Sequence, residues 1–190
     1  MGEQETKRIV VGVSGASGAA LGLACLDALR EVGAESHLVL TRGAELTIEQ
    51  ELSMGIDEFR SHADVTYDNR NIGAAIASGT FKVDGMIVAP CSMKTLAGVS
   101  SGYSENLLLR AADVTMKERR PLVLMVRETP FNPIHIDNMQ RLCRIPGVVL
   151  MPPLMTFYSH AQTVDEMVNH IAYKALDVFG FDPQGFKRWS

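Results

Sequence analysis

Five short apolar runs, each followed by a turn and a helix-like stretch, constrain the fold of this chain most strongly. They occupy residues 9–13, 36–40, 85–89, 122–126 and 148–151. Apart from Ser36 and His37, the runs are apolar along their whole length. Both faces of such strands must be covered, which is typical of a parallel sheet between two helical layers. The sequence therefore predicts one α/β domain (residues 1–190, core about 8–180) with a Rossmann-like (flavodoxin-like), doubly wound parallel sheet.

The segments between the runs favour helices. We expect them at 19–31, 43–52, 93–98, 106–117 and 135–143. A last helix opens with a capping box, Thr163-x-x-Glu166, and runs to about Phe179. Residues 54–80 give weak signals, namely a short helix near Glu58 and a loop at 68–71.

Charge and composition exclude several function classes. The chain has 18 Lys and Arg against 22 Asp and Glu, a net charge of −4, which argues against nucleic-acid binding. Residues 9–26 carry no charge, but four glycines interrupt them, so we predict a strand, a turn and a helix there and no membrane segment. Three cysteines without C-x-x-C spacing favour neither a disulfide framework nor a zinc site, and they predict a cytoplasmic protein. The five histidines lack metal-binding spacing, so no metal site is expected.

The turn after the first run is rich in small residues, Gly12-Val-Ser-Gly-Ala-Ser-Gly18. It matches neither the dinucleotide fingerprint nor a Walker A loop. Small residues let the backbone approach a ligand, and a helix starting at Ala19 is expected to offer free N–H groups to an anion. The alternative to ligand binding is that residues 12–18 form only a tight turn between a strand and a helix.

Polar side chains also follow the other runs, where open α/β sheets bind their ligands. Thr41 follows the second run and either caps the next helix or contacts a ligand. Ser92 and Thr95 lie at a helix start after the third run, a position that suits a phosphate or a polar ring edge. Cys91 has no histidine nearby in sequence, so a buried small residue is favoured over a nucleophile. Arg127 follows the fourth run at the expected ligand edge.

Six motifs, taken together and in this order along the chain, resemble those of a known protein family. The resemblance covers about residues 8–180. The motifs are Ser14-Gly-Ala-Ser-Gly18, Pro90-Cys-Ser-Met-Lys-Thr-Leu-Ala-Gly98, Arg110-Ala-Ala-Asp-Val114, Lys117-Glu-Arg-Arg-Pro-Leu-Val123, Arg127-Glu-Thr-Pro130 and Met151-Pro-Pro…Phe157-Tyr158. Together they closely resemble the UbiX-like flavin prenyltransferases, formerly described as aromatic-acid or phenylacrylic-acid decarboxylases. The resemblance implies a metal-independent enzyme that joins a dimethylallyl group from dimethylallyl phosphate to N5 and C6 of reduced FMN. The product, prenylated FMN, then serves a separate UbiD-type decarboxylase.

The resemblance also assigns roles to residues. It implies FMN contacts for Gly15, Ala16, Ser17, Thr41, Ser92, Met93, Lys94, Thr95 and Arg127. It places the donor's phosphate against Arg110, Lys117, Tyr158 and Lys174. Proton transfer falls to Glu128, assisted by Ser17 and Glu51. The family forms homo-oligomers, usually dodecamers, with sites at subunit contacts.

Two departures from the family pattern concern substrate binding. Lys174 stands where many relatives have arginine, which keeps the charge but loses bidentate geometry and leaves monophosphate or diphosphate preference open. Met155-Thr156 replaces the usual Pro-Ala before Phe157.

Two other functions remain as alternatives. One is a non-catalytic FMN-binding partner subunit of a hydroxyarylate decarboxylase, which would not need Glu51, Lys117, Glu128 and Tyr158 together. The other is an FMN-dependent cysteine decarboxylase, whose catalytic histidine has no convincing counterpart here.

Overall fold

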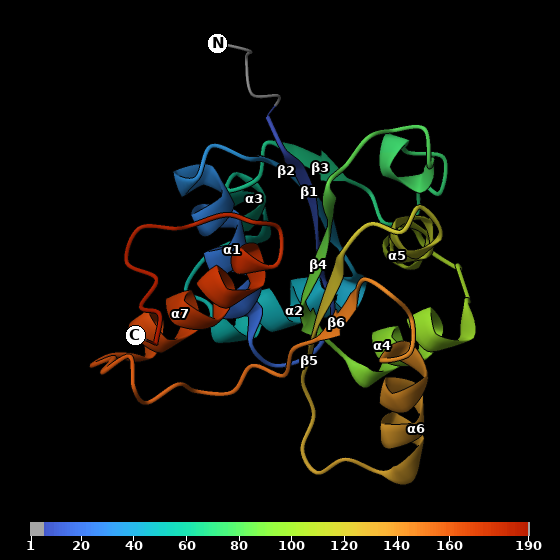
Figure 1. The fold of residues 1–190 in the computed structure, drawn as a ribbon. Coiled ribbons are helices and arrows are strands. Elements are labelled where there is room, and N and C mark those ends of the chain that lie inside the picture. The colour runs from blue at the N-terminus through green and yellow to red at the C-terminus, as the bar shows by residue number, and fades with distance from the viewer. Residues whose placement is uncertain (1–5, 190) are drawn as a thin grey trace.

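The computed structural model describes residues 6–189 and contains one parallel sheet of six strands. The strands are β1 (Arg8–Val13), β2 (Glu35–Leu40), β3 (Val65–Tyr67), β4 (Gly85–Cys91), β5 (Leu122–Val126) and β6 (Val148–Leu150). Their spatial order is β3-β2-β1-β4-β5-β6, so the chain reverses its direction of travel across the sheet between β1 and β4 (Figure 1). In open α/β sheets this reversal opens a crevice at the carboxyl ends of the two strands.

Helices cover both faces of the sheet (Figure 1). One face carries α1 (Ala19–Glu31), α2 (Arg42–Glu51), α3 (Ile56–Arg60) and α7 (Val164–Asp177). The other face carries the 3₁₀ turn η1 (Ala75–Ala77), α4 (Met93–Ser101), α5 (Leu107–Lys117) and α6 (Pro133–Leu142). The doubly wound architecture predicted from the sequence is confirmed.

Two hydrophobic cores lie on either side of the sheet, because alternate strand residues point to opposite faces. In β1, Ile9, Val11 and Val13 pack under α1, whereas Val10 packs under α5. At Gly22, a Cβ atom would lie 2.7 Å from the carbonyl oxygen of Ala89, so only glycine lets α1 approach β4 this closely.

The sequence interpretation missed β3. This edge strand has only three residues, none of them fully buried, so it lacks the continuous apolar run that marks the central strands. The capping box of α7 is also incomplete, because Glu166 accepts a hydrogen bond from the backbone N–H of Gln162 and not from that of Thr163.

Residues 6–189 contain neither a membrane-spanning helix nor a cluster of metal-binding side chains. No helix there is long and apolar enough to cross a membrane. The same residues contain no cluster of His, Cys, Asp and Glu arranged to hold a metal ion.

His37 on β2 predicts a pH dependence of stability. Its side chain is 2% exposed, its Nδ1 lies 2.9 Å from the hydroxyl of Tyr67, and burial lowers its pKa below the usual 6.5 although Glu35 acts in the opposite direction. The unfolded chain therefore binds this proton at higher pH, so the free energy of unfolding falls as the pH drops below about 6.5. We expect His37→Phe to flatten the urea-derived stability profile between about pH 7 and 5.5. Parallel profiles for the two proteins would contradict this assignment.

Candidate active site at the reversal of the sheet

Ser14 ties together the two loops that border the crevice. It is fully buried, and its hydroxyl donates to the carbonyl oxygen of Pro90 at 2.9 Å. The same hydroxyl accepts from the backbone N–H of Ser92 at 2.8 Å. Both hydrogen bonds of the Ser14 hydroxyl are thus made within the protein, where they fix the loop after β1 against the end of β4 and the loop that follows it.

A cavity of about 680 Å³ opens at this edge of the sheet. It gathers seven of the predicted site residues from the loops after β1, β2, β4 and β5, namely Gly15, Thr41, Ser92, Met93, Lys94, Thr95 and Glu128. We call this cavity the main cleft. The backbone of the loop after β1 lies close to the first turn of α2 here, and a Cβ atom on Gly15 would lie 2.8 Å from the Cα of Gly43.

Two helices begin at the main cleft, each with a hydroxyl cap. Thr41 accepts from the backbone N–H of Ala44 at 3.1 Å and caps α2. Ser92 accepts from the backbone N–H of Thr95 at 3.3 Å and caps α4. Lys94 lies exposed in the first turn of α4. These positive helix ends and the lysine give the cleft an environment that suits an anionic group.

The start of α1, in contrast, is already occupied by a carboxylate. Glu51, from the last turn of α2, accepts hydrogen bonds from the backbone N–H groups of Gly18 at 2.8 Å and Ala19 at 2.9 Å. The expectation that α1 offers free N–H groups to a ligand anion was therefore wrong at these two groups. A phosphate at this edge is directed to the starts of α2 and α4 instead.

Two other predicted residues, Ser17 and Arg127, interact with the Glu51 carboxylate. Burial acts to raise the pKa of Glu51, but the backbone N–H groups of Ala19 and Gly18, the hydroxyl of Ser17 and the charge of Arg127 outweigh it, so the pKa lies below the ordinary 4.5. Glu51 is therefore an ionised carboxylate at neutral pH, hydrogen-bonded to Ser17. This chain of groups can relay a proton from a bound molecule through the Ser17 hydroxyl.

The two residues after β5 face different cavities. Glu128 lines the main cleft and accepts from the backbone N–H of Thr129 at 2.9 Å, whereas Arg127 lines a separate apolar cavity. Cys91 is fully buried, and burial raises the pKa of its thiol to about 12, so it is a core residue and not a nucleophile.

The four residues assigned to the donor's phosphate form two pairs. Arg110 and Lys117 lie on α5 beside η1, where Arg110 donates to the carbonyl oxygen of Ala77 and Lys117 pairs with Glu118. We call Arg110, Lys117 and the adjoining loop around Gly79 the α5 half-site. A Cβ atom on Gly79 would lie 2.6 Å from the Nζ atom of Lys117, so the loop passes directly over the lysine.

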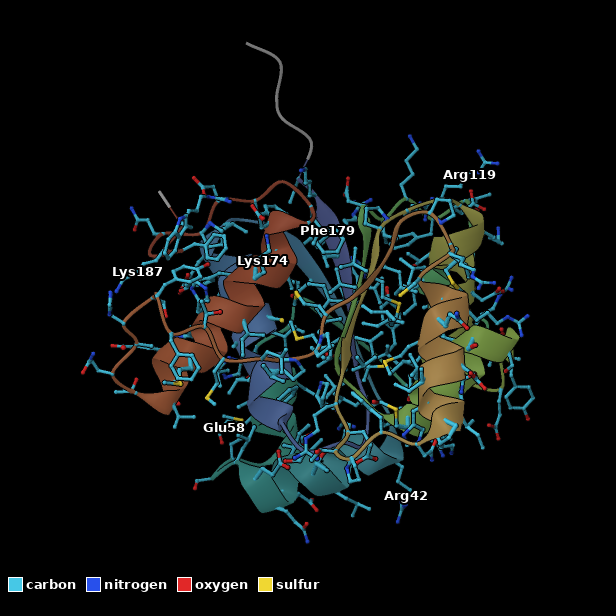
Figure 2. The ribbon with its side chains drawn as sticks, turned by 60° about the horizontal axis from the view of Figure 1, so that its bottom comes forward. Arg42, Glu58, Arg119, Lys174, Phe179 and Lys187 are labelled. Carbon is cyan, nitrogen blue, oxygen red and sulfur yellow. The ribbon has the colours of Figure 1, made fainter. Side chains whose placement is uncertain are left out.

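The second pair lies on the opposite face of the sheet. Tyr158 packs edge-on against His170 of α7 with ring centroids 5.9 Å apart, and Lys174 lies one helical turn further along and pairs with Asp177 at 2.9 Å. We call Tyr158 and Lys174 the α7 half-site. Figure 2 shows Lys174 on α7 and Arg119, just beyond α5, on opposite sides of the molecule. One chain therefore does not bring the four residues together.

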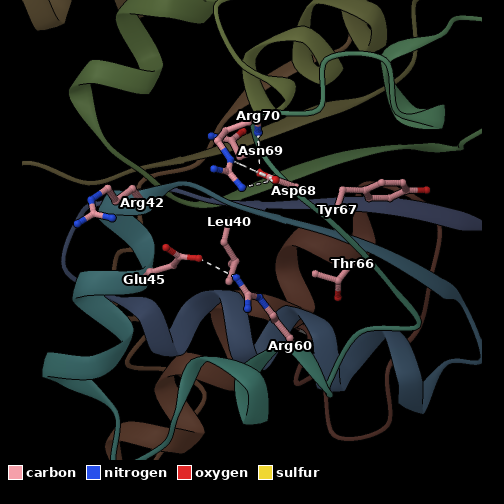
Figure 3. A pocket seen from close by; sticks show the side chains of 9 residues that line it. All are labelled: Leu40, Arg42, Glu45, Arg60, Thr66, Tyr67, Asp68, Asn69 and Arg70. Atoms are coloured by element: carbon pink, nitrogen blue, oxygen red, sulfur yellow. Dashed lines mark hydrogen bonds and ion pairs between the residues drawn. The ribbon is translucent and has the colours of Figure 1, made fainter.

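A second cavity of about 610 Å³ lies beyond β2 and β3 (Figure 3). Its arginines are mostly paired within the protein. Arg60 bonds Glu45 at 2.7 Å, and Arg70 bonds Asp68 at 2.7 Å. Because these charges compensate one another, the cavity offers a weaker anion site than the main cleft does.

Sequence reasoning missed several residues of the main cleft, including Arg42, Asn69 and Asn106. Asn69 accepts the backbone N–H groups of Leu107 and Leu108 through its two oxygens and so fixes the start of α5 beside the cleft. The missed strand β3 explains the omission of Asn69, which lies two residues beyond the end of that strand at the ligand edge. Trp189, whose ring centroid lies 5.3 Å from that of Tyr158, carried no signal in the sequence.

The Ser14 link can be tested with a matched pair of buried serines. Ser14→Ala leaves the half-buried N–H of Ser92 without its partner and removes one of the two hydrogen bonds to the carbonyl oxygen of Pro90, which keeps the backbone N–H of Ser14 at 3.2 Å. We therefore expect a loss of about 1–3 kcal/mol in the free energy of unfolding. The control is Ser100→Ala, because Ser100 is 4% exposed and its hydroxyl has no hydrogen-bond partner among residues 6–189. Denaturant titration should show the first variant destabilised and the second near wild type, and equal losses would contradict the role given to Ser14.

Comparisons with known proteins agree with this geometry. The Flavoprotein family profile matches residues 1–176. The chain is 50% identical over 183 residues to a probable UbiX-like flavin prenyltransferase of Sedimentibacter hydroxybenzoicus, covering 96% of each chain. It superimposes on a crystal structure of AnUbiX (PadA1) in complex with FMN and dimethylallyl pyrophosphate with a TM-score of 0.95, at 43% identity and 98% coverage of each chain.

A dodecameric FMN-dependent UbiX-like decarboxylase from Escherichia coli O157:H7 gives a TM-score of 0.93 at 46% identity, covering 96% of this chain and 99% of that one. The likeness thus spans nearly the whole chain, including the main cleft and both half-sites. The protein belongs to the UbiX-like flavin prenyltransferase family.

Proposed function

We propose that this protein is a flavin prenyltransferase that joins a dimethylallyl group to N5 and C6 of reduced FMN. The observation that carries the proposal is the cluster of Ser17, Glu51 and Arg127 beside a cleft bordered by two capped helix starts. The relatives named above support it, since one is a probable flavin prenyltransferase and another was solved with FMN and dimethylallyl pyrophosphate.

FMN enters as a substrate whose reduced ring supplies N5 as the nucleophile. Its anionic phosphate suits the starts of α2 and α4, where Thr41, Ser92, Lys94 and Thr95 line the main cleft. Gly15 and Ala16 leave the backbone open to the ring, and Arg127 lies at the other side of the Ser17 turn. Glu51 keeps the phosphate away from α1, because two carboxylate or phosphate anions do not share one helix start.

The reaction needs no oxidant or reductant, and each bond that forms is balanced by one that breaks. The bond from N5 to the donor's first carbon forms as the carbon–oxygen bond breaks, the electron pair stays on the phosphate, and N5 loses its proton. The alkene then takes up a proton, its tertiary carbon bonds to C6, and C6 loses a proton. We assign these proton transfers to Glu128 in the main cleft and to the Ser17–Glu51 pair.

The donor's phosphate is held between copies of the chain. The α5 half-site supplies Arg110 and Lys117, and the α7 half-site supplies Tyr158 and Lys174, with the sheet between them. We propose that a homo-oligomer brings the two half-sites together by placing the α5 half-site of one copy against the α7 half-site of another. We further propose that this oligomer is a dodecamer, like the Escherichia coli relative. Cations on both sides then stabilise the departing dianion.

We further propose that dimethylallyl phosphate is the donor and that a UbiD-type decarboxylase receives the product. The three cysteines are free thiols, which agrees with a cytoplasmic location. A non-catalytic FMN carrier is the second candidate, because the main cleft by itself accounts for flavin binding.

The proposed activity predicts a mass change of the flavin. Anaerobic incubation with reduced FMN and dimethylallyl phosphate should add one five-carbon prenyl unit, detected by mass spectrometry. Glu128→Gln should bind both substrates and slow product formation by about 10²–10⁴-fold, the usual contribution of one proton-transfer group. Tightly bound but unmodified FMN, with the diphosphate donor also tested, would favour the carrier.

The shared phosphate site predicts complementation between two inactive variants. Lys117→Met and Lys174→Met should each lower activity, since each removes one cation from every site. Co-expression of the two should restore part of the activity, because some sites in mixed oligomers receive both wild-type lysines. Mixed oligomers of demonstrated composition that stay as inactive as either variant alone would contradict a site built from two copies.

A further inference from the structure

An apolar cavity of about 240 Å³ adjoins the candidate active site. Its walls come from the start of α1, the loop after β6 and the first two turns of α7. The apolar lining side chains are Ala20, Leu21, Pro153, Met155, Val164, Met167, Val168 and Ile171. The spacing of the last four places them on one face of α7. We call this space the α7 cavity.

Only two side chains in the lining of the α7 cavity are polar or charged, Ser17 and Arg127. Both already belong to the candidate active site, through the carboxylate of Glu51. The α7 cavity therefore joins a reactive, polar group of residues to a hydrocarbon-lined space. That combination fits a substrate with a polar reacting end and an apolar tail.

We propose that the α7 cavity binds the hydrocarbon tail of an allylic phosphate donor and that the enzyme also transfers a ten-carbon geranyl group. This inference rests on the proposed prenyl transfer and extends its substrate class. The first isoprene unit lies at the flavin, as for the five-carbon donor, and the second extends between α1 and α7.

The volume of the α7 cavity exceeds what the shorter donor needs. At about 30 Å³ per carbon-sized group, the liquid volume of one water, five further carbons need about 150 Å³. The cavity offers about 240 Å³. Burying an added isoprene unit removes apolar surface from water, which favours binding of the longer donor.

The departure from the family pattern falls on this cavity. Met155, in place of the usual proline, lines it, and its side chain is 59% exposed. An unbranched thioether adapts its shape to a flexible chain better than a proline ring does. Ile171 is 8% exposed at the buried part of the wall, whereas Val164 is 74% exposed, so the cavity has an apolar mouth.

The transfer itself is unchanged in its chemistry. The bond from N5 to the first carbon of geranyl phosphate forms, the carbon–oxygen bond breaks with its electron pair left on phosphate, and N5 loses a proton. The extra isoprene unit takes no part in these bond changes. Its expected effect is on binding of the donor and hence on the ratio of kcat/KM for the two donors.

The test compares dimethylallyl phosphate with geranyl phosphate on the assembled enzyme and reduced FMN without oxygen. We expect the flavin to gain a ten-carbon unit, with kcat/KM within about tenfold of that for the shorter donor. Met167→Trp fills the α7 cavity and should lower geranyl transfer at least about tenfold relative to dimethylallyl transfer. Calorimetry with oxidised FMN bound should show the same selective loss of geranyl phosphate affinity.

Asn169→Trp is the matched control, because Asn169 is exposed on α7 and does not line the cavity. It should leave the ratio of the two donors unchanged. Transfer of dimethylallyl without geranyl in the wild-type enzyme would overturn the inference while leaving the proposed function intact. So would an equal loss of both donors in Met167→Trp. Failure of both donors in the wild type would overturn the proposed function and this inference together.

Discussion

The buried hydroxyl of Ser14 is the interaction on which the candidate site depends. It bonds the end of β4 through the carbonyl oxygen of Pro90 and the loop after β4 through the backbone N–H of Ser92, at the place where the sheet reverses. The reversal alone opens a crevice between two loops. The Ser14 link gives that crevice one geometry, because it fixes Gly15 to Ser17 on one side relative to Ser92 and the start of α4 on the other.

The second constraint is electrostatic. Doubly wound folds commonly bind phosphate at the first helix after β1. Here the Glu51 carboxylate takes the N–H groups of Gly18 and Ala19, so the protein supplies the anion itself. The helix starts at this edge of the sheet therefore have different roles. The starts of α2 and α4 are left to suit a phosphate, and the start of α1 becomes part of a Ser17–Glu51–Arg127 group that suits proton transfer.

The sequence predicted the elements whose physics is local. Strands β1, β4, β5 and β6 were predictable from continuous apolar runs, β2 from the shorter apolar run that ends it, and the cap at Thr41 from its side chain. The edge strand β3 was not, because three half-exposed residues bury too little apolar surface to leave a pattern. The role of Glu51 as a cap for α1 was also hidden, since a bond across 33 residues has no trace in spacing. The resemblance to a family supplied the site residues, but it did not reveal that the sheet separates two of them from the other two.

In one chain the two proposed phosphate-binding pairs lie on opposite faces of the sheet, so the proposed phosphate site needs two copies of the chain. The most direct measurement is a structure of the assembled enzyme with FMN and a phosphate donor bound. The account predicts the flavin in the main cleft, with the donor's phosphate between the α5 half-site of one copy and Tyr158 and Lys174 of another. A donor phosphate held by residues of a single copy, or a flavin phosphate at the start of α1, would contradict it.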